Sequence, residues 1–327
     1  MRKITITLLV LFALLPQAAL ANDSSAKLEA GGLRLVEEAD IIMESEDLYI
    51  SRKEVRVNYI FRNISKSDKR IIVAFPLPKV NVGEMIEGDV GLQSQDPVNF
   101  VDFRVMANGK PVRTRQDVRA WLGKRDITAL LSRYKIPLGP FDQDYFERMG
   151  AMTQTAFEAL KKAGALDPDS VRGDFIRPLW TYQVGYYWEQ NFPAGKPVKL
   201  TQSYKPVIGQ SMDMADTLWN KDGQSDSLRK DYCMDKPFLK GLERLMDSSA
   251  SGVVNTYELG YILTTANNWR GPIGHFRLTI DKGSPRALVS LCISGIRKTG
   301  PTTFLVERRN YKPQSDLKIF FADTSYD

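Results

Sequence analysis

The sequence predicts a mainly β protein made of two β-sandwich-like units, with a helical insertion in the first unit. Apolar and polar residues alternate along most of the chain, which is typical of strands with one buried face. One block, at about 124–175, has helical spacing instead. The 327-residue chain is long enough for two hydrophobic cores. We place the first unit at 22–207 and the second at 208–327.

The first unit opens with a series of strands that form an antiparallel sheet. Pro76 and Pro78 end one of these strands, because proline cannot donate to a β-ladder. Asn108-Gly109 predicts a hairpin turn, since both residues tolerate positive φ. The apolar positions of these strands are Leu48 and Ile50; Val55, Val57, Tyr59 and Phe61; Ile71 to Phe75; and Val101, Phe103 and Val105.

The helical insertion contains two predicted helices. Asp126 is placed to cap the first, which Pro137 ends. The second is predicted over 145–163, with Gly164 as its stop signal.

An aromatic strand follows the insertion and returns through a turn at Pro193-Ala-Gly195 into a strand over 198–204. Trp180 and Trp188 share one face of this strand with Tyr182 and Tyr186, and that face is most simply the sandwich core. Tyr187 points the other way. If the aromatic face is exposed instead, it forms a patch that requires a partner.

The second unit begins with a polar stretch after Pro206 that we interpret as irregular as far as Asp226. A short helix is predicted over 237–246. The remaining segments have the period of strands. They are 257–263, 276–280, 287–293, 303–306 and 317–321.

The N-terminus has the three-part layout of a signal peptide, residues 1–21. Arg2 and Lys3 precede an apolar run that is too short to be a permanent membrane span, and Ala19-Leu-Ala21 is a small-residue cleavage site. We expect the mature chain to begin near Asn22 and to work in the periplasm or outside the cell. An uncleaved anchor is the alternative. No later stretch predicts a transmembrane segment.

The charge pattern argues against a nucleic-acid partner. The formal net charge is +6, and two of these charges leave with the signal peptide. The basic region that starts at Arg113 and contains Arg125 also includes Asp117 and Asp126, which indicates a solvated face rather than a phosphate track.

Cys233 and Cys292 are the two cysteines of the chain. An oxidising compartment favours a disulfide between them, and two buried free thiols are the alternative. A bridge would close a long loop in the second unit.

Six short strings are distributed over most of the mature chain. They are Gly31-Gly-Leu33, Met43-Glu-Ser-Glu-Asp-Leu48, Val73-Ala-Phe-Pro-Leu-Pro78, Asn191-Phe-Pro-Ala-Gly195, Tyr204-Lys-Pro206 and Asn268-Trp-Arg-Gly-Pro-Ile-Gly-His-Phe276. These strings resemble the exported bacterial proteins grouped as family 4424 of domains of unknown function. The resemblance implies export and a β-rich architecture; it carries no catalytic residue or cofactor.

Histidine scarcity argues against most hydrolase designs. His275 is the single histidine, so a metal site built from imidazoles is excluded, and nucleophile–histidine catalysis has one candidate base. The cysteines lack zinc-site spacing, and no phosphate-binding glycine motif follows a strand, so we predict no metal, no nucleotide and no cofactor. A calcium loop near Asp222 and Asp226 stays open but lacks a closing glutamate.

A carboxylate pair of the glycosidase type also stays open. Glu44, Glu46 and Asp47 at the first strand, and Glu189 beside Trp188, are the candidates, although each is more simply a surface charge.

We therefore predict a non-enzymatic binding or interaction protein of the cell envelope, with an envelope glycan or another envelope protein as partner. The competing hypotheses are a carboxylate-dependent glycan hydrolase and a structural or assembly subunit. The predicted contact residues are Trp180, Tyr187, Trp188 and Trp269.

Overall fold

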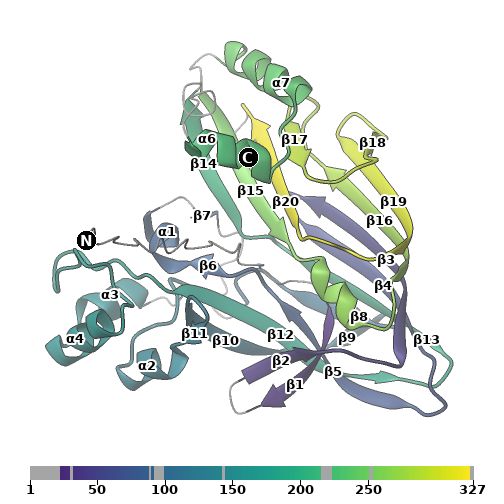
Figure 1. Cartoon of the computed structure of the whole chain (residues 1–327), viewed down its shortest axis with the longest axis horizontal. Coiled ribbons are helices and arrows are strands. Elements are labelled where there is room, and N and C mark those ends of the chain that lie inside the picture. Colours follow the sequence, from purple (N-terminus) through teal and green to yellow (C-terminus); the bar gives the residue numbers. More distant parts are fainter. Residues whose placement is uncertain are drawn as a thin grey trace, which may run out of the picture.

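The computed structural model describes residues 23–29, 32–87, 90–91, 99–141, 144–214, 223–249 and 253–324. The predicted signal peptide at 1–21 lies outside these residues, as does Asp222 of the polar loop. The described residues form three sheets, which confirms the prediction of a mainly β fold with sandwich-like layers (Figure 1).

The first sheet has seven strands among the described residues and carries the aromatic strand β12 near its centre. All its strand pairs are antiparallel. Its order is β11 (Arg125–Asp126), β10 (Arg115–Leu122), β12 (Thr181–Phe192), β5 (Lys69–Pro76), β1 (Ser24–Glu29) and β2 (Gly32–Val36), with β6 (Val80–Asn81) also paired to β12.

The second sheet has eight described strands, and a parallel pair joins β3 to β16 within it. Asn108 and Gly109 both have positive φ at the predicted hairpin turn, which confirms that prediction. The order is β18 (Arg297–Lys298), β19 (Thr303–Tyr311), β16 (Ile273–Asp281), β3 (Ile41–Ser51), β4 (Val55–Asn63), β13 (Pro197–Tyr204), β8 (Arg104–Ala107) and β9 (Lys110–Val112).

The third sheet is smaller and lies at the other end of the molecule from the helical insertion (Figure 1). Its order is β17 (Leu288–Leu291), β20 (Leu317–Asp323), β15 (Val253–Tyr261), β14 (Ile208–Met214) and β7 (Val90–Gly91).

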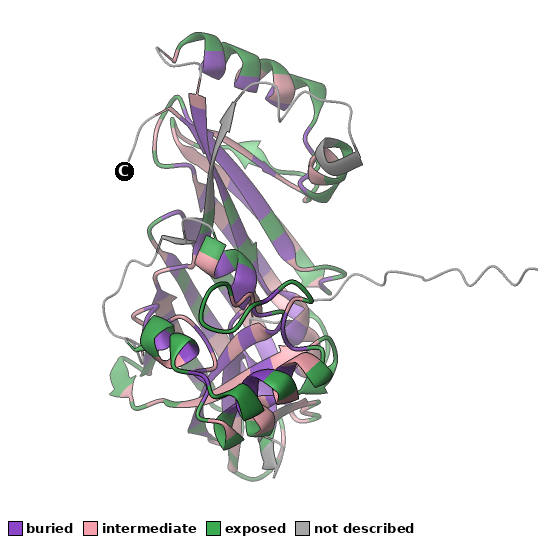
Figure 2. Ribbon diagram, turned by 90° about the vertical axis from the view of Figure 1, so that its left-hand side faces the viewer, coloured by how far each residue is buried: buried purple, intermediate pink, exposed green. Residues whose placement is uncertain are grey.

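The inner face of the eight-stranded sheet packs against both other sheets. Phe61 of β4 contacts Phe192 of the seven-stranded sheet, with ring centroids 5.9 Å apart. The Tyr59 hydroxyl, on the same strand face, lies 3.2 Å from the hydroxyl of Tyr261 in the third sheet. One hydrophobic core therefore extends from the contact of the eight-stranded sheet with the seven-stranded sheet to its contact with the third sheet. Buried residues, purple in Figure 2, lie along the strands at these contacts. The division at residue 207 stays a prediction about folding units.

The helical insertion lies beside the seven-stranded sheet and contains α2 (Thr128–Arg133), α3 (Tyr145–Gly150) and α4 (Gln154–Lys162). The prediction of one helix over 145–163 is wrong. The Thr153 side chain accepts a hydrogen bond from the Ala156 N–H and caps a new helix, so the chain breaks between α3 and α4. Gly164 has φ of 71° and ends α4 as expected. A further short helix, α1 (Val82–Glu87), follows β6.

A second, smaller core covers the outer face of the third sheet. The predicted helix at 237–246 is confirmed as α7 (Lys236–Asp247), which buries Phe238 and Leu242 against Phe320. The prediction that the chain is irregular from after Pro206 to Asp226 is wrong, because this stretch contains β14 and the start of α6 (Gly223–Asp231). Its residues are mostly polar, so the helical period was weak.

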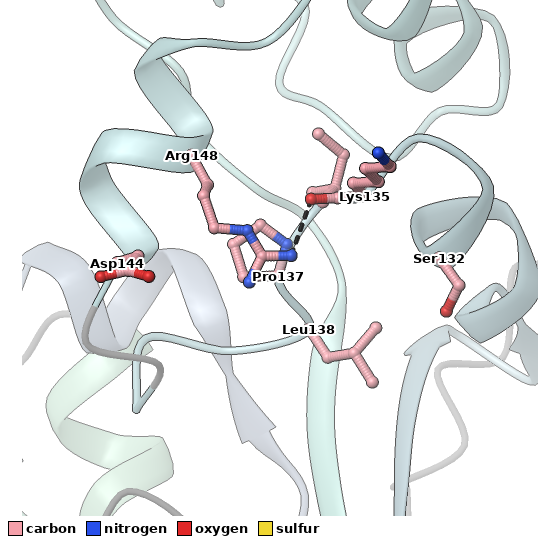
Figure 3. Close-up of a pocket in the computed structure, with 7 residues that line it drawn as sticks. Ser132, Lys135, Pro137, Leu138, Asp144 and Arg148 are labelled. Carbon is pink, nitrogen blue, oxygen red and sulfur yellow. Dashed lines mark hydrogen bonds between the residues drawn. The ribbon is translucent and has the colours of Figure 1, made fainter.

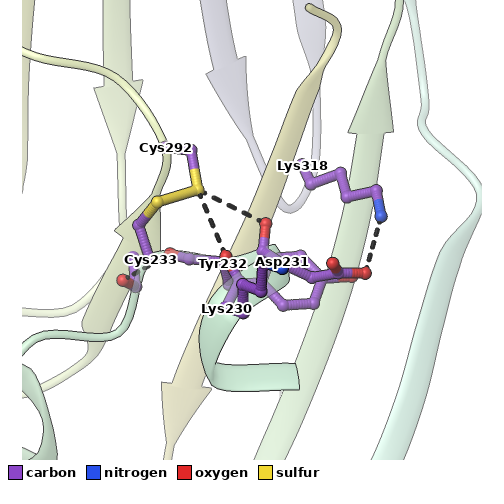
Figure 4. Close-up of a disulfide and its surroundings, with 7 residues drawn as sticks. Lys230, Asp231, Tyr232, Cys233, Cys292 and Lys318 are labelled. Carbon is purple, nitrogen blue, oxygen red and sulfur yellow. Dashed lines mark hydrogen bonds and ion pairs between the residues drawn. A yellow bond between two sulfur atoms is a disulfide. The ribbon is translucent and has the colours of Figure 1, made fainter. Parts of the chain in front are cut away.

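The predicted disulfide between Cys233 and Cys292 is present and ties the α6–α7 turn to the end of β17 (Figure 4). Beside it, Lys318 of β20 forms an ion pair with Asp231 at 2.7 Å. The bridge therefore fastens the helical cover to the sheet that it covers.

Candidate ligand-binding site

Three of the four predicted contact residues are core residues. Trp180, Trp188 and Trp269 have exposed fractions of 0%, 3% and 2%. The Trp180 indole N–H donates to the Leu138 carbonyl, and that of Trp269 donates to the Asp23 carbonyl, each at 2.8 Å. A partner at the surface has almost no area to touch on these side chains, so their physical role is packing, as the shared face of Trp180 and Trp188 indicated.

Tyr187 lies on the opposite face of β12 and is partly exposed. It pairs across the sheet with Ala74 of β5 and Arg115 of β10. This outer face, rather than the aromatic inner face, carries a cleft.

The cleft has a volume of about 330 Å³ and lies over the centre of the seven-stranded sheet. Its floor is made by outward-facing positions of β5, β10 and β12, two residues along each strand from the Ala74–Tyr187–Arg115 row. Gly185 of β12 leaves room there because it has no side chain. The lining residues are Leu33, Leu35, Ala74, Pro76, Lys79, Asp117, Arg119, Trp121, Gln183 and Gly185.

The β1–β2 hairpin supplies one wall of the cleft. β1 pairs with β5 through Ser24 to Ala26 only. Beyond that point the hairpin crosses the outer face, because the Leu33 N–H donates to Asp117 of β10 at 3.2 Å. Asp117 also accepts from the Arg119 guanidinium at 2.9 Å. The Asp117 carboxylate is therefore already hydrogen-bonded within the protein.

Lys79 is different, because its ammonium has no carboxylate partner among the described residues. Its Nζ lies 4.4 Å from the centroid of the Trp121 ring. Burial lowers the pKa of Lys79, since desolvation disfavours the charged form. By contrast, Arg119 has a raised pKa because Asp117 accepts its hydrogen bonds. Lys79 is thus a partly desolvated cation that lacks an anion.

Lys79 also lines a second hollow, which we call the junction cavity, of about 180 Å³. It lies where all three sheets meet, because its lining comes from the β5–β6 loop, from β12 and β13, and from β14 and β15. Apart from Lys79, the described residues of its lining carry no charged side chain. The lining residues are Leu77, Pro78, Lys79, Val80, Phe100, Val101, Tyr182, Val184, Tyr204, Pro206, Val207, Gly209 and Gly260.

The floor of the junction cavity is buried and its mouth is open. Phe100, Val184 and Tyr204 are no more than 4% exposed, whereas Gly209 and Gly260 are exposed. The Tyr204 hydroxyl makes no hydrogen bond to a described residue, and burial raises the pKa of Tyr204. Apart from this hydroxyl the buried floor is apolar, so the cavity is suited to an apolar group that enters past glycine.

Two further hollows lie elsewhere. One, in the helical insertion, is lined by Ser132, Lys135, Asp144 and Arg148, and the Arg148 guanidinium there donates to the Lys135 carbonyl at 2.8 Å (Figure 3). That bond holds Lys135, whose φ is 57°, in its left-handed turn. The other lies beside the disulfide.

The carboxylates of the hydrolase hypothesis line neither the cleft nor the junction cavity. Glu189 pairs with Arg70, and Glu44 pairs with Arg62. Glu46 is buried and accepts from the Tyr261 hydroxyl at 3.4 Å, whereas Asp47 points to solvent. Within the described ranges, no three His, Cys, Asp or Glu side chains gather as metal ligands would.

Sequence reasoning missed Lys79 and Trp121. Trp121 belongs to β10, whose charged residues hid its alternation, and Lys79 follows Pro78 in a loop. A signal was nevertheless present. Two strings of the family resemblance, Val73–Pro78 and Tyr204–Pro206, each contribute residues to the junction cavity.

The fold and its hollows define a mainly β protein with two recesses that share Lys79, a lysine with no carboxylate partner among the described residues. The chain belongs to the family described as a domain of unknown function, DUF4424, whose model matches residues 21–320. This confirms the family resemblance. No curated protein matches the chain.

Among solved structures, the chain is similar to a crystal structure of a "putative nutrient binding protein" from Legionella pneumophila. The two share 15% sequence identity with a TM-score of 0.45, over 93% of this chain and 72% of that chain. Among the described residues, no helix is long and apolar enough to cross a membrane.

Proposed function

We propose that the protein is an extracytoplasmic binding protein whose small ligand occupies the cleft over the seven-stranded sheet. Lys79 carries the proposal. A partly buried ammonium without a counter-charge is unfavourable, and a ligand with a negative charge or strong acceptor oxygens would stabilise it. The aromatic ring of Trp121 beneath Lys79 holds the cation in place before a ligand arrives.

The extracytoplasmic location is proposed from the signal-peptide pattern at 1–21 and accords with the disulfide between Cys233 and Cys292. A soluble ligand in that compartment would reach the cleft directly. Envelope glycans remain candidates because sugars also present acceptor oxygens, and Tyr187 beside the cleft offers them a ring.

The test is a ligand screen on the chain from Asn22, produced in an oxidising compartment. The melting temperature is measured against envelope glycan fragments, small carboxylates and phosphates, and each hit is titrated by calorimetry. Lys79→Met should weaken a genuine hit at least tenfold. Lys110→Met, which removes an exposed lysine on β9, is the matched control.

A hit that both variants bind as tightly as the unmodified protein contradicts the assignment to this cleft. No change in melting temperature across the whole library contradicts a small-ligand function. The expected partner is then an envelope protein, to be found by crosslinking.

A further inference from the structure

We infer that the ligand is a small amphiphile, with a monoanionic head held at Lys79 and one apolar group inserted into the junction cavity. The inference rests on the proposed function and names the class of ligand. Lys79 is the lining residue that both hollows share, so we place the head of the ligand there, next to the linings of both hollows.

The size of the junction cavity indicates a group rather than a whole molecule. Pockets for complete ligands usually measure about 300–1,000 Å³. At about 180 Å³ the junction cavity is smaller, whereas the cleft reaches about 330 Å³. Apolar cavities of roughly 150 Å³ hold benzene, so a ring of that size or an alkyl chain of about six carbons is the expected occupant.

The charges indicate the head. Asp117 and Asp126 already pair with Arg119, so Lys79 is the charged lining residue of the cleft without a partner among the described side chains. One uncompensated positive charge matches one negative charge, and a carboxylate supplies it. A head with several charges is excluded, because the lining on either side of Lys79 has apolar side chains that would leave the extra charges unpaired. These are Leu33, Leu35 and Pro76 in the cleft, and Phe100 and Val184 in the cavity.

Gly260 provides a way to close the cavity without disturbing the fold. A Cβ built there meets only the Pro78 ring, at 3.9 Å, which is ordinary contact. Gly260 lies in β15, where a β-branched residue is well accepted. Gly260→Val therefore places an isopropyl group against Pro78, at the exposed side of the cavity lining. Gly150→Val, at a position with nothing within 4 Å of the added Cβ, is the matched control.

The experiment titrates the full mature chain with straight-chain monocarboxylates from acetate to octanoate and with the matching primary alcohols. Affinity should rise about fourfold per methylene and level off near six carbons. Gly260→Val should weaken hexanoate at least tenfold and leave acetate unchanged. Lys79→Met should abolish the preference for hexanoate over hexanol.

Equal binding of acetate and hexanoate, or equal hexanoate binding by Gly260→Val and Gly150→Val, overturns the amphiphile inference. If a glycan or phosphate from the screen binds in a Lys79-dependent way while the carboxylates do not, the cleft stands and the inference fails. If Lys79→Met changes the affinity for none of the ligands tested, the proposed function itself fails.

Discussion

The backbone N–H of Leu33 donates to Oδ2 of Asp117 at 3.2 Å, although 84 positions separate the two residues. This bond attaches the N-terminal hairpin to the outer face of a sheet whose edge it only partly pairs with. One carboxylate thereby joins a wall of the cleft to its floor.

Asp117→Ala should loosen that wall and lower the free energy of unfolding by about 2 kcal/mol, since it removes charge-assisted bonds and leaves a partly buried Arg119 with Asp126 alone. Denaturant unfolding measures the change. Glu54→Ala breaks a well-exposed pair with Arg56 and should cost less than about 1 kcal/mol. Equal losses in both variants would show that the hairpin contact contributes no more stability than an exposed ion pair.

Trp188→Ala should act on stability rather than on binding. Its side chain is 3% exposed and packs in the main core, so truncation should cost about 3–5 kcal/mol. Tyr187→Ala, one residue along on the exposed face, should cost much less. A folded Trp188→Ala variant with unchanged stability and lost ligand binding would restore the tryptophan as a contact residue.

Asp23 should give the protein a distinctive pH dependence. Burial raises the pKa of this carboxyl from 3.8 to about 8, so between these values the folded chain holds a proton that the unfolded chain releases. The free energy of unfolding therefore falls as pH rises through this window, by at most about 1.4 kcal/mol per pH unit from this group. Its contribution is fully present below pH 4 and lost above pH 8.

Asp23→Asn should flatten the curve and make the variant more stable than the unmodified protein at pH 8. The measurement is denaturant unfolding at one-unit intervals from pH 4 to pH 9. Parallel curves for the two proteins would show that Asp23 titrates normally.

Gly274 should tolerate no side chain. A Cβ at this position would lie 2.6 Å from the Glu44 carbonyl oxygen, where a bulge in β3 brings the backbone close to β16. Gly274→Ala should cost about 1–3 kcal/mol because the parallel pair must separate. Gly150→Ala has open space and should be neutral or slightly stabilising. Thermal unfolding of both variants decides; a neutral Gly274→Ala would mean that β3 shifts freely.

Loss of the disulfide should destabilise the packing of α6 and α7 on the third sheet. Cys233 and Cys292 are 59 residues apart, and a loop of that length contributes about 4 kcal/mol on the chain-entropy model. The double serine variant should unfold at lower denaturant, and a reductant should then have no further effect on it. A further drop on reduction would point to another process.

Sequence periodicity was sufficient for the strands with one buried face. Val55, Val57, Tyr59 and Phe61 alternate in the sequence and are all buried in β4. Periodicity failed where local chemistry competes with it. Thr153 fits the apolar face of one long helix by spacing, yet its hydroxyl caps a second helix instead.

The candidate site was less predictable, because it depends on contacts that periodicity cannot express. Lys79 and Trp121 meet through the pairing of β12 with both β6 and β10, and Gly260 comes to the same place from another sheet. The density of aromatic residues instead led us to predict Trp180 and Trp188 as contact residues, although both side chains are buried in the core. Tyr187 was the predicted residue that faces the cleft side of the sheet.

The parallel pair of β3 and β16 also sets the order of events when the chain folds. The Tyr49 hydroxyl donates to Asp281 across 232 positions. Until β3 pairs with β16, the two parts of the eight-stranded sheet are not joined. Closing so long a loop is entropically costly, and such distant pairings make folding slow. β3, which is synthesised early, therefore has no partner on this side until β16 has been made. In the meantime β3 offers an open edge that another chain can pair with, so this protein's yield should depend more on chaperones and dilution than on its final stability.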